Sequence, residues 1–156
     1  MELLTFESLP LPEQVLKGIR DAKFETCTPI QSKSLPITLG KKDLAGQAQT
    51  GTGKTAAFLI TLLTRLLEKT PPPVVKGKEG PRALIIAPTR ELARQIEKDA
   101  LLLGKHCDFR TVCVIGGVDY DKQRNQIKAG VDILIATPGR LIDFYKQKFF
   151  SLKSVE

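Results

Sequence analysis

Residues 48–55 read Ala48-Gln49-Thr50-Gly51-Thr52-Gly53-Lys54-Thr55, and this stretch decides the fold. Its two glycines let the backbone turn tightly, so that consecutive N–H groups converge on an anion. Lys54 adds a positive charge for β- and γ-phosphates, and the Thr55 hydroxyl can ligate Mg²⁺. Ala48 replaces the first glycine of the strict pattern, at a position that needs only a small residue. The sequence predicts a phosphate-binding loop; the alternative is a surface turn rich in glycine and threonine.

The segments on either side of this loop support the phosphate-binding interpretation. A short extended stretch from Asp43 to Gln47 precedes the loop, and a strongly apolar helix from Ala56 to Leu67 follows it. The loop therefore leads into a helix N-terminus, where unpaired backbone donors and the helix dipole favour a phosphate group.

Continuous apolar runs alternate with helical patterns in the rest of the chain. The runs are Leu84–Ala87, Val112–Ile115 and Ile133–Ala136, and the helical patterns are Glu91–Leu103, Tyr120–Lys128 and Arg140–Lys146. They predict an α/β fold, a parallel sheet with helices on both faces. Polar motifs that follow these strands lie at the carboxyl edge of the sheet, where α/β folds place their ligands. The stretch from Thr70 to Pro81, rich in Pro, Gly and Lys, is predicted to be an exposed loop.

Composition limits the class of protein. The chain has 156 residues, and 24 Lys and Arg against 17 Asp and Glu give a net charge of +7. That excess suits a polyanionic partner, although ordinary surface charge explains it equally well. No apolar stretch reaches membrane-spanning length, and the first residues do not resemble a signal peptide. We expect a cytoplasmic protein with no membrane partner, in which Cys27, Cys107 and Cys113 are reduced thiols and His106 is a surface residue.

Thr28-Pro29-Ile30-Gln31 opens a predicted helix and has two interpretations. Thr28 is a good N-cap, Pro29 suits the first helical position, and Gln31 completes a capping box by bonding the Thr28 N–H. The functional alternative uses the same amide, because one donor and one acceptor match the N6/N7 edge of adenine. Phe24, just upstream, would then lie against the base.

Two further motifs place a threonine and an arginine at a helix start after a strand. They are Pro88-Thr89-Arg90-Glu91-Leu92 and Thr137-Pro138-Gly139-Arg140. Hydroxyls, helix N-terminal amides and arginines are common phosphate contacts. Gly116-Gly117, after another strand, allows close backbone approach to a ligand. Each motif alone is weak, since Thr-Pro is also a plain helix start, but together they are specific.

In this order, the motifs resemble those of the DEAD-box RNA helicases. Phe24 with residues 28–31 is similar to the family's Q motif, and Phe6 stands at the place of its upstream aromatic residue. Residues 48–55 match motif I, residues 88–92 match motif Ia, Gly116-Gly117 matches the GG motif, and residues 137–140 match motif Ib. The chain differs from the family at two positions of the Q motif, with Lys23 where glycine is common and Cys27 where proline is common.

The resemblance implies a RecA-like P-loop NTPase domain that uses ATP and Mg²⁺ and binds RNA. Phe24 and Gln31 would read adenine, and Ala48 to Thr55 would hold the phosphates. Lys54 and Thr55 would be the catalytic residues, with Thr55 also binding Mg²⁺. The residues implied to face RNA are Pro88, Thr89, Arg90, Gly116, Gly117, Thr137, Pro138, Gly139 and Arg140. We expect two segments: an N-terminal helical segment with the Q motif (1–40) and a partial RecA-like domain (41–156).

Three stretches indicate a narrower similarity within the family. Residues 45–50, 120–123 and 130–135 are similar to bacterial members associated with the RNA degradosome. That similarity implies a role in mRNA decay, with degradosome components as protein partners.

The family's next motif, Asp-Glu-Ala-Asp, does not occur in these 156 residues. We expect the chain to be truncated before the strand that carries it, and to bind nucleotide without hydrolysing ATP or unwinding RNA. An uncovered sheet edge would also favour self-association. Two alternatives stay open: a non-catalytic module that binds RNA or another partner, and a different P-loop enzyme such as a small kinase.

Overall fold

The computed structural model describes residues 4–71 and 80–156. The chain divides into two compact units, the first made of Met1–Thr70 and Asp99–Asp108 and the second of Pro71–Lys98 and Phe109–Glu156. In the described ranges, no helix is both long and apolar enough to cross a membrane. Most of the predicted loop from Thr70 to Pro81, residues 72–79, lies outside the described residues.

The first unit is helical. Its elements are the 3₁₀ turn η1 (Phe6–Ser8), α1 (Glu13–Asp21), α2 (Pro29–Leu39), α3 (Lys54–Glu68) and the end of α4 (Arg90–Leu103). The predicted apolar helix after the loop is α3, which buries Leu59, Ile60 and Leu63 completely. Helix α2 packs against α3, and the hydroxyls of Thr38 and Thr61 join the two helices at 2.7 Å.

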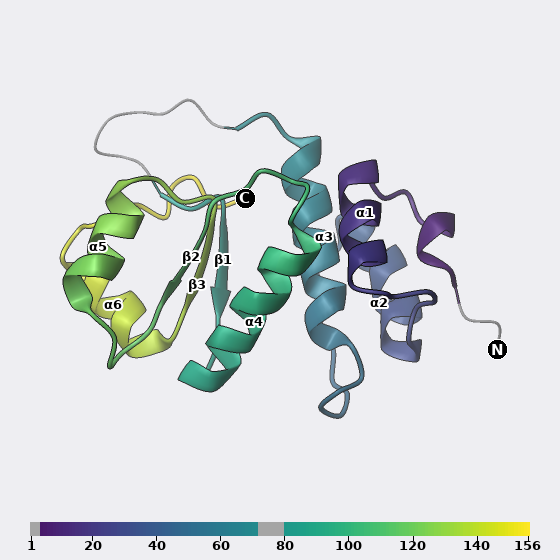
Figure 1. Ribbon diagram of the computed structural model, residues 1–156, viewed down its shortest axis with the longest axis horizontal. Coiled ribbons are helices and arrows are strands. Elements are labelled where there is room, and N and C mark those ends of the chain that lie inside the picture. The colour runs from purple at the N-terminus through teal and green to yellow at the C-terminus, as the bar shows by residue number, and fades with distance from the viewer. Residues whose placement is uncertain (1–3, 72–79) are drawn as a thin grey trace. The chain divides into compact units, whose positions relative to one another are not determined.

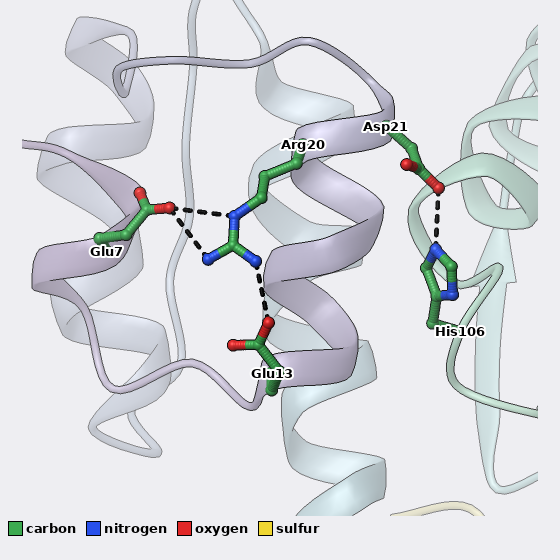
Figure 2. Close-up of polar contacts among 5 residues, drawn as sticks. All are labelled: Glu7, Glu13, Arg20, Asp21 and His106. Carbon is green, nitrogen blue, oxygen red and sulfur yellow. Dashed lines mark hydrogen bonds and ion pairs between the residues drawn. The ribbon is translucent and has the colours of Figure 1, made fainter.

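Helix α1 is tied to its surroundings by two sets of charges (Figure 2). Arg20 bridges the carboxylates of Glu7, at 3.2 Å, and Glu13, at 2.8 Å. Asp21 accepts a 2.8 Å contact from Nε2 of His106, in the turn after α4, and this bond lowers the pKa of the Asp21 carboxyl. Gly18 permits this packing, because an added Cβ would lie 1.9 Å from the carbonyl oxygen of Leu103.

The turn after α1 holds a lysine in a left-handed backbone conformation. Lys23 has a φ of 58°, and its N–H donates to the carbonyl of Arg20 at 2.9 Å. The N–H of Phe24 donates to the carbonyl of Ile19 at 3.2 Å. This pair of bonds is a Schellman motif, whose left-handed position favours glycine because glycine has no Cβ. The motif accounts physically for the glycine common at this position in the resembling family.

The second unit contains a parallel sheet of three strands. They are β1 (Ala83–Ile86), β2 (Thr111–Val114) and β3 (Ile133–Ala136), in the order β1-β3-β2, with Ile133 opposite both Ala83 and Thr111. The predicted α/β fold is therefore confirmed, with each strand within one residue of its apolar run. The central strand β3 is completely buried, as a continuous apolar sequence requires.

Helices cover both faces of this sheet (Figure 1). One face packs on α5 (Tyr120–Lys128) and α6 (Pro138–Lys146), in a core formed by Val112, Val114, Ile127, Leu134, Ala136, Leu141, Phe144 and Phe150. The first part of α4 lies on the other face. There, burial raises the pKa of the Cys113 thiol to about 11, and the nearby charges of Glu97 and Arg94 on α4 act on it in opposite directions.

The stretch before the loop and the edge strands of the sheet can be compared with the expectations from the sequence. The stretch from Asp43 to Gln47, expected to be extended, forms no strand and is exposed, because no described segment pairs with it. In the described sheet β1 and β2 are the edge strands, and Ile86 on β1 is 57% exposed. Self-association through this edge stays a prediction.

Candidate nucleotide-binding loop and nucleic-acid cleft

Glycines shape the loop that precedes α3. Gly51 and Gly53 have φ angles of 82° and 91°, the left-handed region that residues with a Cβ rarely adopt. Gly53 is the N-cap of α3, and a Cβ there would lie 2.5 Å from Nε2 of Gln31. At Gly51 a Cβ would meet no atom within 4 Å, so this side of the loop is open. The predicted loop therefore has both the strained turn and the open face that an anion needs.

Several carbonyl groups of the loop accept hydrogen bonds from side chains. The hydroxyl of Thr28 donates to the carbonyl of Thr52 at 2.8 Å, and Nε2 of Gln31 donates to that of Gly53 at 3.1 Å. The Thr52 hydroxyl donates to the carbonyl of Gln49 at 2.7 Å. By contrast, the N–H groups of residues 50–55 donate to no described residue. The loop thus presents unpaired donors, which is the property that binds phosphate oxygens.

Lys54 lies folded over the loop. Its ammonium donates to the carbonyl of Ala48 and, at 3.0 Å, to that of Gln49. A phosphate group offers a stronger, charged acceptor than a carbonyl, so Lys54 can exchange these bonds for a bound anion. Thr55 follows in the first turn of α3 and is half-buried. No three His, Cys, Asp or Glu side chains gather as a metal site within residues 4–71 and 80–156, so Thr55 remains a predicted Mg²⁺ ligand.

Gln31 serves the helix and the loop at once. The capping box is confirmed: Thr28 N–H donates to Oε1 of Gln31 at 2.9 Å, and Gln31 N–H donates to the Thr28 hydroxyl at 3.4 Å. The Gln31 side chain is only 3% exposed. Its second amide hydrogen and the second lone pair of Oε1 are the groups left to read an adenine edge. The capping interpretation is therefore confirmed, and the adenine interpretation stays a prediction.

The ring of Phe24 is partly exposed and lies beside a buried ring. Its ring is 41% exposed and stacks on Phe6, with centroids 6.4 Å apart and an interplanar angle of 27°. Phe6 is completely buried and so fixes the orientation of Phe24. One face of Phe24 thus lies against Phe6, and stacking of a base on the exposed part of the ring stays a prediction.

The second unit carries a cleft at the carboxyl edge of its sheet. Its volume is about 650 Å³, and its lining residues are Pro88, Thr89, Arg90, Glu91, Gly116, Thr137, Pro138, Gly139 and Arg140. The structure thus gathers eight of the nine residues implied to face RNA, adds Glu91, and leaves Gly117 out of the lining. The three motifs meet because parallel strands end at one edge.

Arg90 explains the Gly116-Gly117 pair. A Cβ on Gly117 would lie 2.4 Å from Nη1 of Arg90, and one on Gly116 would lie 3.3 Å from Nη2. Gly117 also has a φ of 76°. The close approach expected of a ligand at these glycines is made by the guanidinium of Arg90, which packs against the loop.

Arg140 is held by a residue that the sequence analysis did not single out. Its Nη1 donates to Oε1 of Gln123 at 2.8 Å, and its guanidinium lies over the rings of Tyr120, at 5.2 Å, and Phe144, at 5.5 Å. Gln123 falls on one helical face with Tyr120 and Ile127. A glutamine on the apolar stripe of an otherwise polar helix is the signal that could have found it.

Comparisons with known proteins find one family and several relatives that are similar to this chain. The model of the DEAD/DEAH box helicase family matches residues 28–156. ATP-dependent RNA helicase RhlB of Xanthomonas campestris pv. campestris (strain B100) is 54% identical over 154 residues, or 98% of this chain and 27% of the relative. The RhlB of Idiomarina loihiensis is 52% identical over 97% of this chain and 35% of its own length.

A solved structure of a DEAD box protein is also similar to this chain. The crystal structure of a DEAD box protein from Methanococcus jannaschii aligns over 100% of this chain and 40% of its own, with a TM-score of 0.84 and 32% sequence identity. The chain spans about a quarter to a third of the length of the curated relatives described above.

Proposed function

This chain belongs to the DEAD/DEAH box helicase family, and from that premise we propose that it forms the ATP-binding loop and part of the RNA cleft of an ATP-dependent RNA helicase. The relatives described above carry that activity in their names. The observation that carries the proposal is the difference between the hydrogen-bond acceptors and the hydrogen-bond donors of the loop from Ala48 to Thr55. The carbonyls of Gln49, Thr52 and Gly53 accept bonds from side chains, while the N–H groups of residues 50–55 donate to no residue that the structure describes.

ATP and Mg²⁺ fit the residues present in the first unit. The unpaired N–H groups of the loop hold the phosphates, and Lys54 turns from the Ala48 and Gln49 carbonyls toward them. Thr55 supplies a hydroxyl ligand, and a bound Mg²⁺ would neutralise phosphate charge. Phe24 and Gln31 hold the adenine between a supported ring and an amide.

RNA binding is proposed for the cleft of the second unit. Arg90 and Arg140 offer guanidinium groups, and Thr89 and Thr137 offer hydroxyls, at the starts of α4 and α6. These are groups that bind phosphate and sugar rather than base edges, so the proposed binding has little sequence specificity.

We further propose that these 156 residues bind nucleotide without hydrolysing ATP. Hydrolysis in P-loop NTPases depends on acidic groups that hold Mg²⁺ and on a residue that orients the attacking water. The resemblance to the family implies that these acidic groups come from an Asp-Glu-Ala-Asp motif. That motif does not occur in these 156 residues. A continuous RNA-stimulated release of phosphate by the pure chain would contradict this part of the proposal.

The experiment that tests the nucleotide site titrates a fluorescent ADP analogue into the chain. Lys54→Ala is expected to weaken ADP binding by about tenfold or more, because a charge-assisted hydrogen bond to phosphate is lost. The control Lys33→Ala, exposed on α2, is expected to bind ADP as the wild type does. Wild-type affinity in Lys54→Ala would reject the proposed site.

The same variant separates the proposal from a module that binds only RNA or protein. Under the proposal, Lys54→Ala binds nucleotide more weakly while RNA binding, measured in parallel, stays unchanged. A wild-type chain that binds RNA but no ADP or ATP would favour the RNA-binding module. Association with degradosome components and a cytoplasmic location stay predictions, which co-purification and cell fractionation would test.

A further inference from the structure

We propose that Gln123 is a positioning residue that holds Arg140 and the Gly116-Gly117 loop in the arrangement that binds an RNA phosphate. This inference rests on the proposed RNA cleft and adds to it a neutral residue that lies outside the cleft lining. Gln123 would act through Arg140 rather than by touching RNA.

The Gln123 amide joins two cleft segments through its two ends. Nε2 donates to the carbonyl of Ile115 at 3.1 Å, and Oε1 accepts from Nη1 of Arg140 at 2.8 Å. The side chain is 2% exposed, so water offers little replacement for either bond. The two partners also fix the orientation of the amide, because a flipped amide would face a donor with a donor and a carbonyl with a carbonyl.

Arg140 gains a fixed orientation from this contact. Both of its hydrogen bonds use Nη1, one to Gln123 and one to the carbonyl of Val118 at 3.4 Å. The aromatic rings of Tyr120 and Phe144 hold the face of the guanidinium. Its Nε and Nη2 donors are used by no described residue and remain for a phosphate. A guanidinium ordered before binding loses less conformational entropy when the phosphate arrives.

The other end of the amide reaches the segment that carries Arg90. Ile115 immediately precedes Gly116, and the guanidinium of Arg90 packs on the Gly116-Gly117 pair. Through one buried amide, the supports of both cleft arginines are therefore linked. Loss of the amide is expected to loosen charged contacts without removing a charge.

The test measures binding of a short fluorescent oligoadenylate to the chain at increasing salt concentration. Gln123→Met keeps the length of the side chain and removes both hydrogen bonds. We expect about a tenfold loss of affinity, as for one charge-assisted hydrogen bond, and a decrease of about 0.7 in the salt slope, as for one lost phosphate contact on a single strand. The matched control Gln126→Met makes the same change at an exposed position of α5 and is expected to match the wild type.

A double-variant cycle with Arg140→Gln distinguishes positioning from a general loss of structure. If Gln123 acts through Arg140, the double variant binds RNA no more weakly than Arg140→Gln alone. Additive losses, or an unchanged salt slope in Gln123→Met, would overturn the inference. Equal RNA binding by the wild type and Arg140→Gln would instead reject the proposed cleft.

A second variant covers the case in which Gln123→Met does not fold. Arg140→Lys keeps the positive charge but replaces the planar fork with one nitrogen, which we expect to reach Gln123 or a phosphate but not both. Affinity close to that of Arg140→Gln would support the inference, and wild-type affinity would contradict it.

Discussion

Gln31 donates from Nε2 to the carbonyl of Gly53 across 3.1 Å, which links the start of α2 to the N-cap of α3. Oε1 of the same amide accepts the N–H of Thr28 at 2.9 Å. A Cβ on Gly53 would collide with this amide, so the bond also requires glycine at that position. The residue expected to read adenine is therefore the residue that supports the phosphate loop.

Gln31→Ala is expected to weaken ADP binding by about tenfold and to abolish any preference for ADP over GDP. The variant removes both the amide that matches adenine and the hydrogen bond that holds the Gly53 carbonyl. Fluorescence titrations with ADP and GDP analogues measure both effects. Gln14→Ala, exposed on α1, serves as the control. A variant that still prefers ADP would show that adenine is read elsewhere.

Lys23→Gly is expected to stabilise the chain. Lys23 has a φ of 58°, and a left-handed conformation costs a residue with a Cβ about 1–2 kcal/mol, whereas glycine gives up about 0.4–1 kcal/mol through its more flexible unfolded state. The net gain in the free energy of unfolding should be about 0.5–1 kcal/mol. Urea denaturation measures it as a higher midpoint with an unchanged slope.

Lys17→Gly is the control for this stabilisation, because Lys17 is exposed in the middle of α1. Glycine there should destabilise the chain by about 1 kcal/mol, the usual cost inside a helix. If both variants lowered the midpoint, the strain attributed to Lys23 would be absent.

Local sequence signals predicted much of the fold because they depend on neighbouring residues. The capping box of Thr28 and Gln31 and the apolar runs of the three strands all appear where the sequence placed them. The stretch from Asp43 to Gln47, expected to be extended, belongs to no strand of the described sheet, because a strand exists only with a paired neighbour.

The meeting of three motifs in one cleft was predictable from the sequence, whereas the contacts within it were less so. Parallel topology brings motifs Ia, GG and Ib to one edge, so their meeting followed from the strand pattern. The packing of Arg90 on Gly117 and the bridge from Gln123 to Arg140 are tertiary contacts between segments distant in sequence. Neither propensity nor periodicity specifies such contacts, although the position of Gln123 on a buried helical face indicated burial.

Asp21 is expected to make the stability of the chain depend on pH in the acidic range. The hydrogen bond from His106 lowers the pKa of Asp21 in the folded state below its unfolded value of about 3.9. As the pH falls, the unfolded state therefore binds the proton first. The stabilisation is complete above about pH 5 and is lost as the pH falls through about 4 toward the folded pKa.

Asp21→Asn tests this dependence in thermal unfolding followed by circular dichroism. The variant should melt below the wild type at neutral pH, and the difference should vanish as the solution is acidified. Asp43→Asn, at an exposed position, is the control. A difference between wild type and Asp21→Asn that stays constant with pH would contradict the role of the Asp21 carboxylate.

Two threonines of α3 have buried hydroxyls whose removal is expected to change the stability of the chain in opposite directions. The Thr64 hydroxyl is buried and has no hydrogen-bond partner among the residues that the structure describes. The Thr61 hydroxyl contacts that of Thr38 at 2.7 Å and the carbonyl of Ala57 at 3.0 Å. Valine keeps the branched shape and removes the hydroxyl in both cases. Thr64→Val should stabilise the chain by about 1 kcal/mol, because an unpaired buried group is removed.

Thr61→Val should destabilise the chain by about 1 kcal/mol, because it removes the bond that joins α2 to α3. Since both positions lie in one helix and receive the same substitution, helix propensity and packing volume largely cancel between them. Urea denaturation of the two variants gives the comparison, and a shift of both midpoints in the same direction would contradict it. Opposite shifts would show that the sign of the stability change depends on whether the hydroxyl has a hydrogen-bond partner, and not on its burial.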